Sequence, residues 1–156
     1  MPDLLVKLYE LPAASPDVER LASEGVICRR AETFERRRIL DFVDQRWPRW
    51  TDEVAAAFHA VPPTLFLAAT GTEPIGFAAY NATRPNYFGP TAVRNDQRKR
   101  GVGTALLWLA LDALRGEGYA YAIIGGAGPT AFYERTVGAM VIPDSEGGIY
   151  EAKFLG

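Results

Sequence analysis

Apolar residues recur along this chain in two patterns, one typical of strands and one typical of helices. Residues 64–70 and 74–81 are apolar at nearly every position, which predicts two strands that are covered on both faces and lie centrally in a sheet. A turn at residues 71–74 joins them in a predicted hairpin. A strand is also predicted at residues 26–30, and we expect it to be the first strand of the main sheet. Further strands are predicted at residues 87–93, 119–124, 139–142 and 149–155. The last two are expected to form a closing hairpin.

Helical spacing is clear between residues 33 and 46, where Ile39, Phe42 and Val43 recur on one side. The same spacing and the helix start and stop residues predict helices at about residues 16–24, 33–46, 51–59, 101–115 and 130–137. Because these helices are interspersed with the strands, the order predicts an α/β fold, a mixed α+β sheet with helices on both faces.

The helix predicted at residues 101–115 has a wide apolar face, which Leu107, Trp108 and Leu111 extend. We expect the N-terminal segment or a partner subunit to cover this extra surface. Residues 1–25 are therefore expected to form an N-terminal extension that packs on a domain at residues 26–156. Both a monomer and a homodimer fit these observations.

Length and composition fit one globular domain. The 156 residues are enough to bury about two-thirds of the unfolded surface. The formal net charge of −2 argues against a broad face for nucleic acid. Cys28 is the single cysteine, and neither a targeting pattern nor a long apolar run is present. We expect a cytoplasmic protein with no membrane and no nucleic-acid partner.

The residues around the start of the helix at 101–115 give the clearest sign of chemistry. Residues 98–104 read Arg-Lys-Arg-Gly-Val-Gly-Thr. The first backbone N–H groups of a helix have no partners within the helix and the helix dipole is positive there, so an anion binds without any side-chain charge. Gly101 and Gly103 allow the backbone to come close to that anion. The pattern predicts a phosphate-binding loop.

Two nucleotide-binding loops do not fit this sequence. A Walker A loop needs a lysine after its second glycine, and none stands there. The dinucleotide fingerprint needs a third glycine where the chain has Leu106.

The spacing Arg/Gln-x-x-Gly-x-Gly/Ala after a strand resembles the pyrophosphate loop of the GNAT family of coenzyme A-dependent N-acetyltransferases. Residues 93–98 are similar to the family's Val-x-Pro-x-x-Arg lead into the loop, with Asn95 in place of the proline. Residues 132–135, Phe-Tyr-Glu-Arg, followed by Gly138 and Ala139, are similar to a second family segment. The likeness spans about residues 26–155. It implies the acyl-CoA N-acyltransferase fold and metal-free transfer of acetyl from acetyl-CoA to a primary amine in a ternary complex.

The resemblance also implies a donor site. Its residues are Ala92, Val93, Arg98, Lys99, Arg100, Gly101, Val102, Gly103 and Thr104. A backbone N–H at Ala92 or Val93 would stabilise the oxyanion, and Lys99, Arg100 or Arg94 would meet the 3′-phosphate. The pantetheine arm is expected between the strands at 87–93 and 119–124.

Tyr133 is the candidate catalytic acid, because a phenol within reach can protonate the departing thiolate. The alternative is a tyrosine packed in the core. No acidic residue lies between Tyr87 and Val93, so the general base stays open among Glu53, Asp52, Asp96, Tyr80 and His59.

Aromatic residues are the candidates for the wall of the acceptor pocket, with packing in the core as the alternative. They are Trp47, Trp50, Tyr80, Tyr87 and Tyr150. The basic run at residues 36–38 is expected to be a solvated face, with an acidic substrate as the alternative. The acceptor itself, a small molecule or a peptide, is not named by the sequence.

Two other functions keep the same loop. A non-catalytic coenzyme A-binding or regulatory module fits the missing carboxylate at residues 87–93. A nucleic-acid-binding domain would use the basic residues between Arg94 and Arg100.

Overall fold

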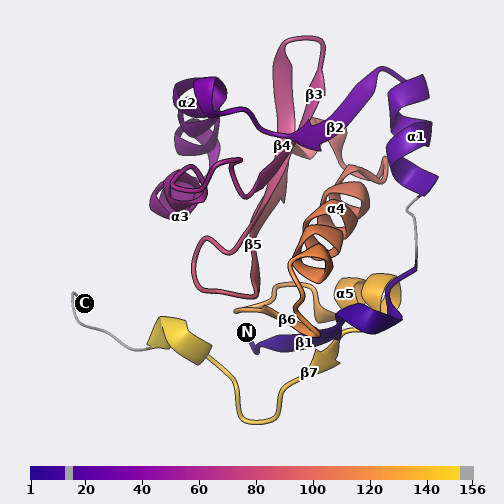
Figure 1. Cartoon of the computed structure of the whole chain (residues 1–156), viewed down its shortest axis with the longest axis vertical. Coiled ribbons are helices and arrows are strands. Elements are labelled where there is room, and N and C mark those ends of the chain that lie inside the picture. The colour runs from indigo at the N-terminus through magenta and orange to yellow at the C-terminus, as the bar shows by residue number, and fades with distance from the viewer. Residues whose placement is uncertain (13–15, 152–156) are drawn as a thin grey trace.

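The structure is a computed structural model that describes residues 1–12 and 16–151. Its centre is a seven-stranded sheet with the order β2-β3-β4-β5-β6-β1-β7 (Figure 1). Only β5 and β6 pair in parallel, and the other neighbours pair antiparallel. The strands are β1 Leu4–Lys7, β2 Val26–Arg30, β3 Leu65–Thr70, β4 Glu73–Tyr80, β5 Tyr87–Val93, β6 Tyr121–Ile124 and β7 Met140–Val141.

Helices cover both faces of the sheet, as predicted. Residues of α4 and α5 share one core cluster with one face, and residues of α2 and α3 share a second cluster with the other face (Figure 1). The helices are α1 Pro16–Ser23, α2 Arg36–Arg46, α3 Thr51–Ala57, α4 Val102–Gly116 and α5 Thr130–Val137. Short 3₁₀ helices are η1 Leu8–Glu10, η2 Thr33–Glu35, η3 Pro48–Trp50, η4 Asn95–Gln97 and η5 Gly148–Glu151.

Strands β3 and β4 are central and mostly buried, which confirms the prediction from their apolar sequences. Gly76 of β4 lies where the backbone of β5 and the helix α4 come close. A Cβ at this position would be 3.0 Å from the Ala92 carbonyl oxygen and 3.3 Å from Leu106 Cδ1. The glycine therefore lets α4 pack tightly on the sheet that carries its loop.

Two expectations about the sheet are wrong. The chain enters the sheet before β2, because β1 pairs with β6 on one side and with β7 on the other. Residues 148–151 form η5 and not the second arm of a closing hairpin, and residues 152–155 of that arm lie outside the described residues. Strand β1 occupies the edge of β7 that faces β6, so no second arm of the hairpin can pair with β7 on that side. A domain boundary at residue 26 stays a prediction.

The N-terminal segment covers the wide apolar face of α4. Leu107, Trp108 and Leu111 are buried, and both η1 and α1 pack against this helix. Arg115 of α4 also donates a hydrogen bond of 2.9 Å to the Leu11 carbonyl oxygen. One of the two expected covers, the N-terminal segment, is therefore present within the chain.

Candidate functional site

Strands β5 and β6 start as neighbours and then separate. They pair only at Tyr87 with Ile123 and at Phe88 with Ile124. Beyond Phe88, residues 91–93 of β5 pair with β4 on one side, and among the described residues no strand pairs with the other side. A register shift of the β4–β5 pairing lies at the same place. The open edge offers backbone groups to a peptide-like ligand.

The direction of the backbone groups distinguishes Ala92 from Val93. The Arg94 N–H donates to the Ile75 carbonyl oxygen of β4 at 2.8 Å. In a strand, the N–H and C=O of one residue point to one edge, and those of the next residue point to the other edge. The N–H and C=O of Ala92 therefore face β4, and those of Val93 face the open edge. Val93 is therefore the better placed of the two expected oxyanion donors.

A cavity of about 380 Å³ lies along this open edge. Three parts of the chain line it: the end of β5, the residues from Gln97 to the first turns of α4, and the start of α5. The lining residues are Phe88, Thr91, Ala92, Val93, Gln97, Arg98, Lys99, Gly101, Val102, Gly103, Thr104, Leu107, Pro129, Phe132 and Tyr133. Of the nine predicted donor-site residues, the structure brings together all but Arg100 in this cavity.

The two glycines of the loop have different roles. Gly101 is the N-cap of α4 and has a φ of +88°, which residues with a Cβ rarely adopt. Gly103 has no such backbone, and a Cβ there would meet Val93 Cγ2 at an ordinary 3.8 Å. No side chain of the described residues caps the start of α4. The first amides of the helix are thus left for an anion.

The basic side chains of the loop divide into two groups. Arg94 is paired with Asp96, with its Nη2 2.6 Å from the carboxylate, and the pKa of Asp96 is lowered by this partner. Arg100 donates to Gln97 Oε1 at 2.7 Å and lies at a second hollow beside the loop. Arg98 and Lys99 line the cavity and are exposed. They are the cations best placed to meet a phosphate.

Tyr133 is one of the residues that line the cavity. It is buried, with only 7% of its surface exposed, and its ring packs edge-on against Phe88 and Phe132. Burial raises the pKa of the phenol above its ordinary value, so the hydroxyl is protonated at neutral pH. Tyr133 thus belongs both to the core and to the cavity wall.

The expected acceptor aromatics are not all in one place. Tyr80 is buried in the core, where its hydroxyl accepts a hydrogen bond of 2.6 Å from Arg30 Nη1. Trp47 and Trp50 pack against the core beneath α2 and α3. The rings of Tyr87 and Tyr150 both lie against Gly125. A Cβ on this glycine would be 3.1 Å from Tyr87 and 3.6 Å from Tyr150.

A carboxylate lies beside the Tyr150 ring. The hydroxyls of Tyr150 and Thr83 both donate to Glu53 Oε2, the former at 3.3 Å. The pKa of Tyr150 is raised by burial and by the negative charge of Glu53. Thr83 was not predicted, because no local pattern links it to a residue of α3. The two hydroxyls hold the Glu53 carboxylate in place, whereas the other candidate bases Asp52, His59 and Asp96 are exposed.

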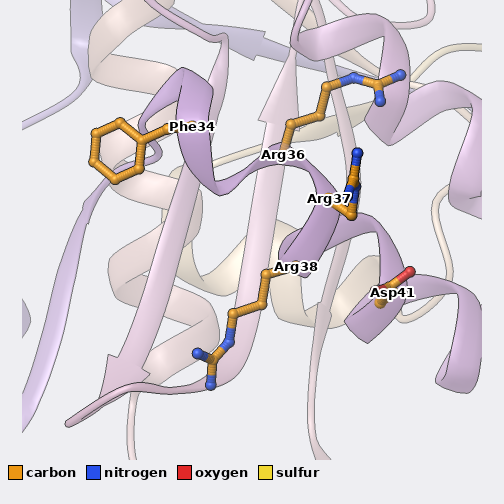
Figure 2. A pocket seen from close by; sticks show the side chains of 5 residues that line it. All are labelled: Phe34, Arg36, Arg37, Arg38 and Asp41. Atoms are coloured by element: carbon orange, nitrogen blue, oxygen red, sulfur yellow. The ribbon is translucent and has the colours of Figure 1, made fainter.

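The basic run at the start of α2 borders a shallow hollow of about 540 Å³. Figure 2 shows that Arg36, Arg37 and Arg38 point in different directions and that Phe34 points away from them. All three arginines are exposed, and Arg38 pairs with Glu73 at 3.3 Å. Since the groups diverge, they form a solvated face more readily than a site for one ligand.

Residues 1–12 and 16–151 include no helix that is long and apolar enough to span a bilayer. Their His, Cys, Asp and Glu side chains form no group of three or more that would hold a metal ion.

Solved structures with the same fold include GCN5-related N-acetyltransferases. The glucosamine N-acetyltransferase region of a fungal multi-domain GH3 β-N-acetylglucosaminidase superposes with a TM-score of 0.74 at 14% identity, over 90% of this chain and 19% of that chain. An N-acetyltransferase from Sphaerobacter thermophilus gives a TM-score of 0.68 at 19% identity, over 90% of this chain and 48% of that one. The chain thus spans a fifth to a half of the length of these proteins. At these identities the likeness shows the fold.

Sequence comparison identifies the family. No curated protein matches the chain. The family model for the acetyltransferase (GNAT) family matches residues 29–139, which include β5, the loop, α4 and α5. With well over half of its residues matched, the chain belongs to the acetyltransferase (GNAT) family.

Proposed function

We propose that this chain transfers an acetyl group from acetyl-CoA to a primary amine by direct attack in a ternary complex. One observation supports the proposal most: a single cavity joins the uncapped start of α4, the open edge of β5 and Tyr133. An acyl-CoA donor needs a site for its phosphates, a surface for its peptide-like arm and a proton for its leaving sulfur. The cavity offers a candidate for each.

The donor would lie along the cavity from the loop to Tyr133. The amides of residues 101–104 would hold the pyrophosphate, with Arg98 and Lys99 adding charge. The pantetheine amides would pair with the β5 edge beyond Phe88. In this arrangement the thioester would lie at the end of the arm, beside Val93 and Tyr133.

The chemical steps follow from these positions. The neutral amine attacks the thioester carbonyl carbon, the C–N bond forms, and negative charge develops on the oxygen. The Val93 N–H would stabilise this oxyanion. When the C–S bond breaks, the sulfur takes the proton of Tyr133, and the proton released by the attacking nitrogen restores the phenol. The raised pKa of Tyr133 keeps the acid in its protonated form before the reaction.

The acceptor would enter beside Glu53, Tyr87 and Tyr150. A carboxylate next to aromatic rings attracts an ammonium group, by charge and by the negative ring faces. Tyr87 and Phe88 are successive residues of β5, so the side chain of Tyr87 lies on the face of the strand opposite to Phe88, which lines the donor cavity. We assign to Glu53 the attraction of the ammonium form of the acceptor and the acceptance of its proton, which leaves the neutral amine for the attack.

The rival function is a coenzyme A-binding module without chemistry. The absence of a carboxylate on β5 favours it, whereas the placement of Glu53 from α3 favours the enzyme. Nucleic-acid binding through residues 94–100 is less well supported, because Arg94 and Arg100 already have partners in Asp96 and Gln97.

A panel of amines tested with acetyl-CoA for release of the free thiol separates these functions. Thiol release above the amine-free rate, reduced in Tyr133→Phe but not in Tyr119→Phe, is the expected result. Tyr119 is a suitable control, since it packs partly buried against the same core. Thermal stabilisation by acetyl-CoA without thiol release for any amine would favour the binding module. No stabilisation by acetyl-CoA would overturn the donor site.

A further inference from the structure

Helix α1 contacts the candidate phosphate loop through the side chain of Arg20. Its Nη2 donates a hydrogen bond of 2.6 Å to the carbonyl oxygen of Arg100. The same nitrogen would be 2.5 Å from a Cβ on Gly101. The Arg20 guanidinium therefore lies directly against the N-cap of α4. Arg20 stands before residue 29, where the family match begins.

Carboxylates hold the Arg20 guanidinium in this position. Its Nη2 lies 3.2 Å from Asp17 Oδ1, and its Nη1 lies 3.2 Å from Glu24 Oε2. Glu24 also lies 3.7 Å from Arg100 Nη2. These groups are partly exposed, so each ion pair adds little to folding stability. Together they fix the direction in which Arg20 points.

The charges of this cluster cancel. Arg20 and Arg100 are positive, and Asp17 and Glu24 are negative. The cluster therefore adds little net attraction for a phosphate. Its effect is on the orientation of the peptide group between Arg100 and Gly101.

In a planar trans peptide the C=O and the next N–H point in opposite directions. The bond from Arg20 turns the Arg100 carbonyl toward α1, and so turns the Gly101 N–H away from α1. Gly101 lines the donor cavity and begins the row of uncapped amides. A carbonyl turned to the other side would instead present a negative dipole to the phosphates.

We propose that Arg20 is a positioning residue for the acetyl donor: by holding the Arg100 carbonyl against α1, it orients the first amides of α4 for the pyrophosphate. This inference rests on the proposed function. It means that residues outside the matched family region take part in donor binding.

The test compares coenzyme A affinity, measured by calorimetry, in the full chain and in Arg20→Gln. We expect the Kd to rise about tenfold, which corresponds to about 1.4 kcal/mol of binding free energy. At saturating acetyl-CoA, kcat should be unchanged. Arg20→Lys keeps a cationic hydrogen-bond donor but loses the planar guanidinium, so its Kd should lie between that of the unchanged chain and that of Arg20→Gln. The difference should persist in high salt, since it does not depend on net charge.

Arg38→Gln is the matched control. Arg38 is also an exposed arginine paired with a glutamate, on the other face of the sheet, and its loss should leave the Kd unchanged. If Arg20→Gln binds coenzyme A as the unchanged chain does, the inference is overturned while the proposed function stands. If the unchanged chain does not bind, the proposed function itself fails. If Arg20→Gln does not fold, Arg20→Lys decides: an affinity equal to that of the unchanged chain would overturn the inference.

Discussion

Replacing Gly101 by alanine tests the geometry of the loop. At a φ of +88° an alanine is strained, which costs about 1–2 kcal/mol of folding free energy. The new Cβ would also lie 2.5 Å from Arg20 Nη2, so this side chain must move. Arg20 would then give up its bond to the Arg100 carbonyl; this bond is exposed, so water replaces it at little cost in folding free energy.

Two effects are therefore expected in Gly101→Ala. The free energy of unfolding should fall by about 1–2 kcal/mol, measured by chemical denaturation. The affinity for acetyl-CoA should fall about tenfold or more, measured by calorimetry, because the first amides of α4 lose their orientation.

Gly118→Ala is the control for strain alone. Gly118 has a φ of +98°, and no atom lies within 4 Å of its added Cβ. It follows the far end of α4, a helix of 15 residues and so about 22 Å long. This variant should lose a similar stability and keep its affinity. Equal acetyl-CoA affinity in the two variants would refute the reasoning about the loop.

Four further predictions follow from the site and the core. Tyr133→Phe should lower kcat by about 10²–10⁴-fold with little change in coenzyme A affinity, and an unchanged kcat would show that Tyr133 is a core residue only. Because burial raises the pKa of Tyr133, its ionisation should abolish kcat only at a pH above the range in which an ordinary tyrosine ionises. Glu53→Gln should raise the KM for the amine and leave coenzyme A affinity as it is; an unchanged KM would separate Glu53 from the acceptor. Burial raises the pKa of Cys28 to about 11, so iodoacetamide at neutral pH should not modify this thiol in the folded protein and should modify it after unfolding. Mass spectrometry follows the modification, and rapid modification of Cys28 in the folded protein would contradict its burial. Gly76→Ala should lower the free energy of unfolding by about 1–3 kcal/mol, because its Cβ would lie 3.0 Å from the Ala92 carbonyl oxygen. If the variant and the unchanged chain gave the same denaturation curve, the sheet and α4 would accommodate the Cβ without loss of stability, and the prediction would be wrong.

Much of the fold could be predicted from local patterns. The apolar runs of β3 and β4 indicated central strands, and the glycines before α4 indicated a helix start left open for an anion. Both features depend on a few consecutive residues. Periodicity and loop chemistry are sufficient for such features.

The rest depended on contacts between distant residues. Strand β1 has four residues, too few for a clear alternation, and its place between β6 and β7 depends on pairing across most of the chain. The bond between Arg20 and Arg100 joins residues 80 positions apart, and the bond between Tyr150 and Glu53 joins residues 97 positions apart. No local pattern records such pairs, so Arg20 and Thr83 entered the account only with the structure.

A crystal structure of the chain with coenzyme A tests the central claim most directly. The account predicts the pyrophosphate on the amides at the start of α4, the pantetheine arm on the open edge of β5, and the sulfur within hydrogen-bond distance of the Tyr133 hydroxyl. Coenzyme A bound elsewhere, with the cavity between β5, α4 and α5 empty, would contradict it.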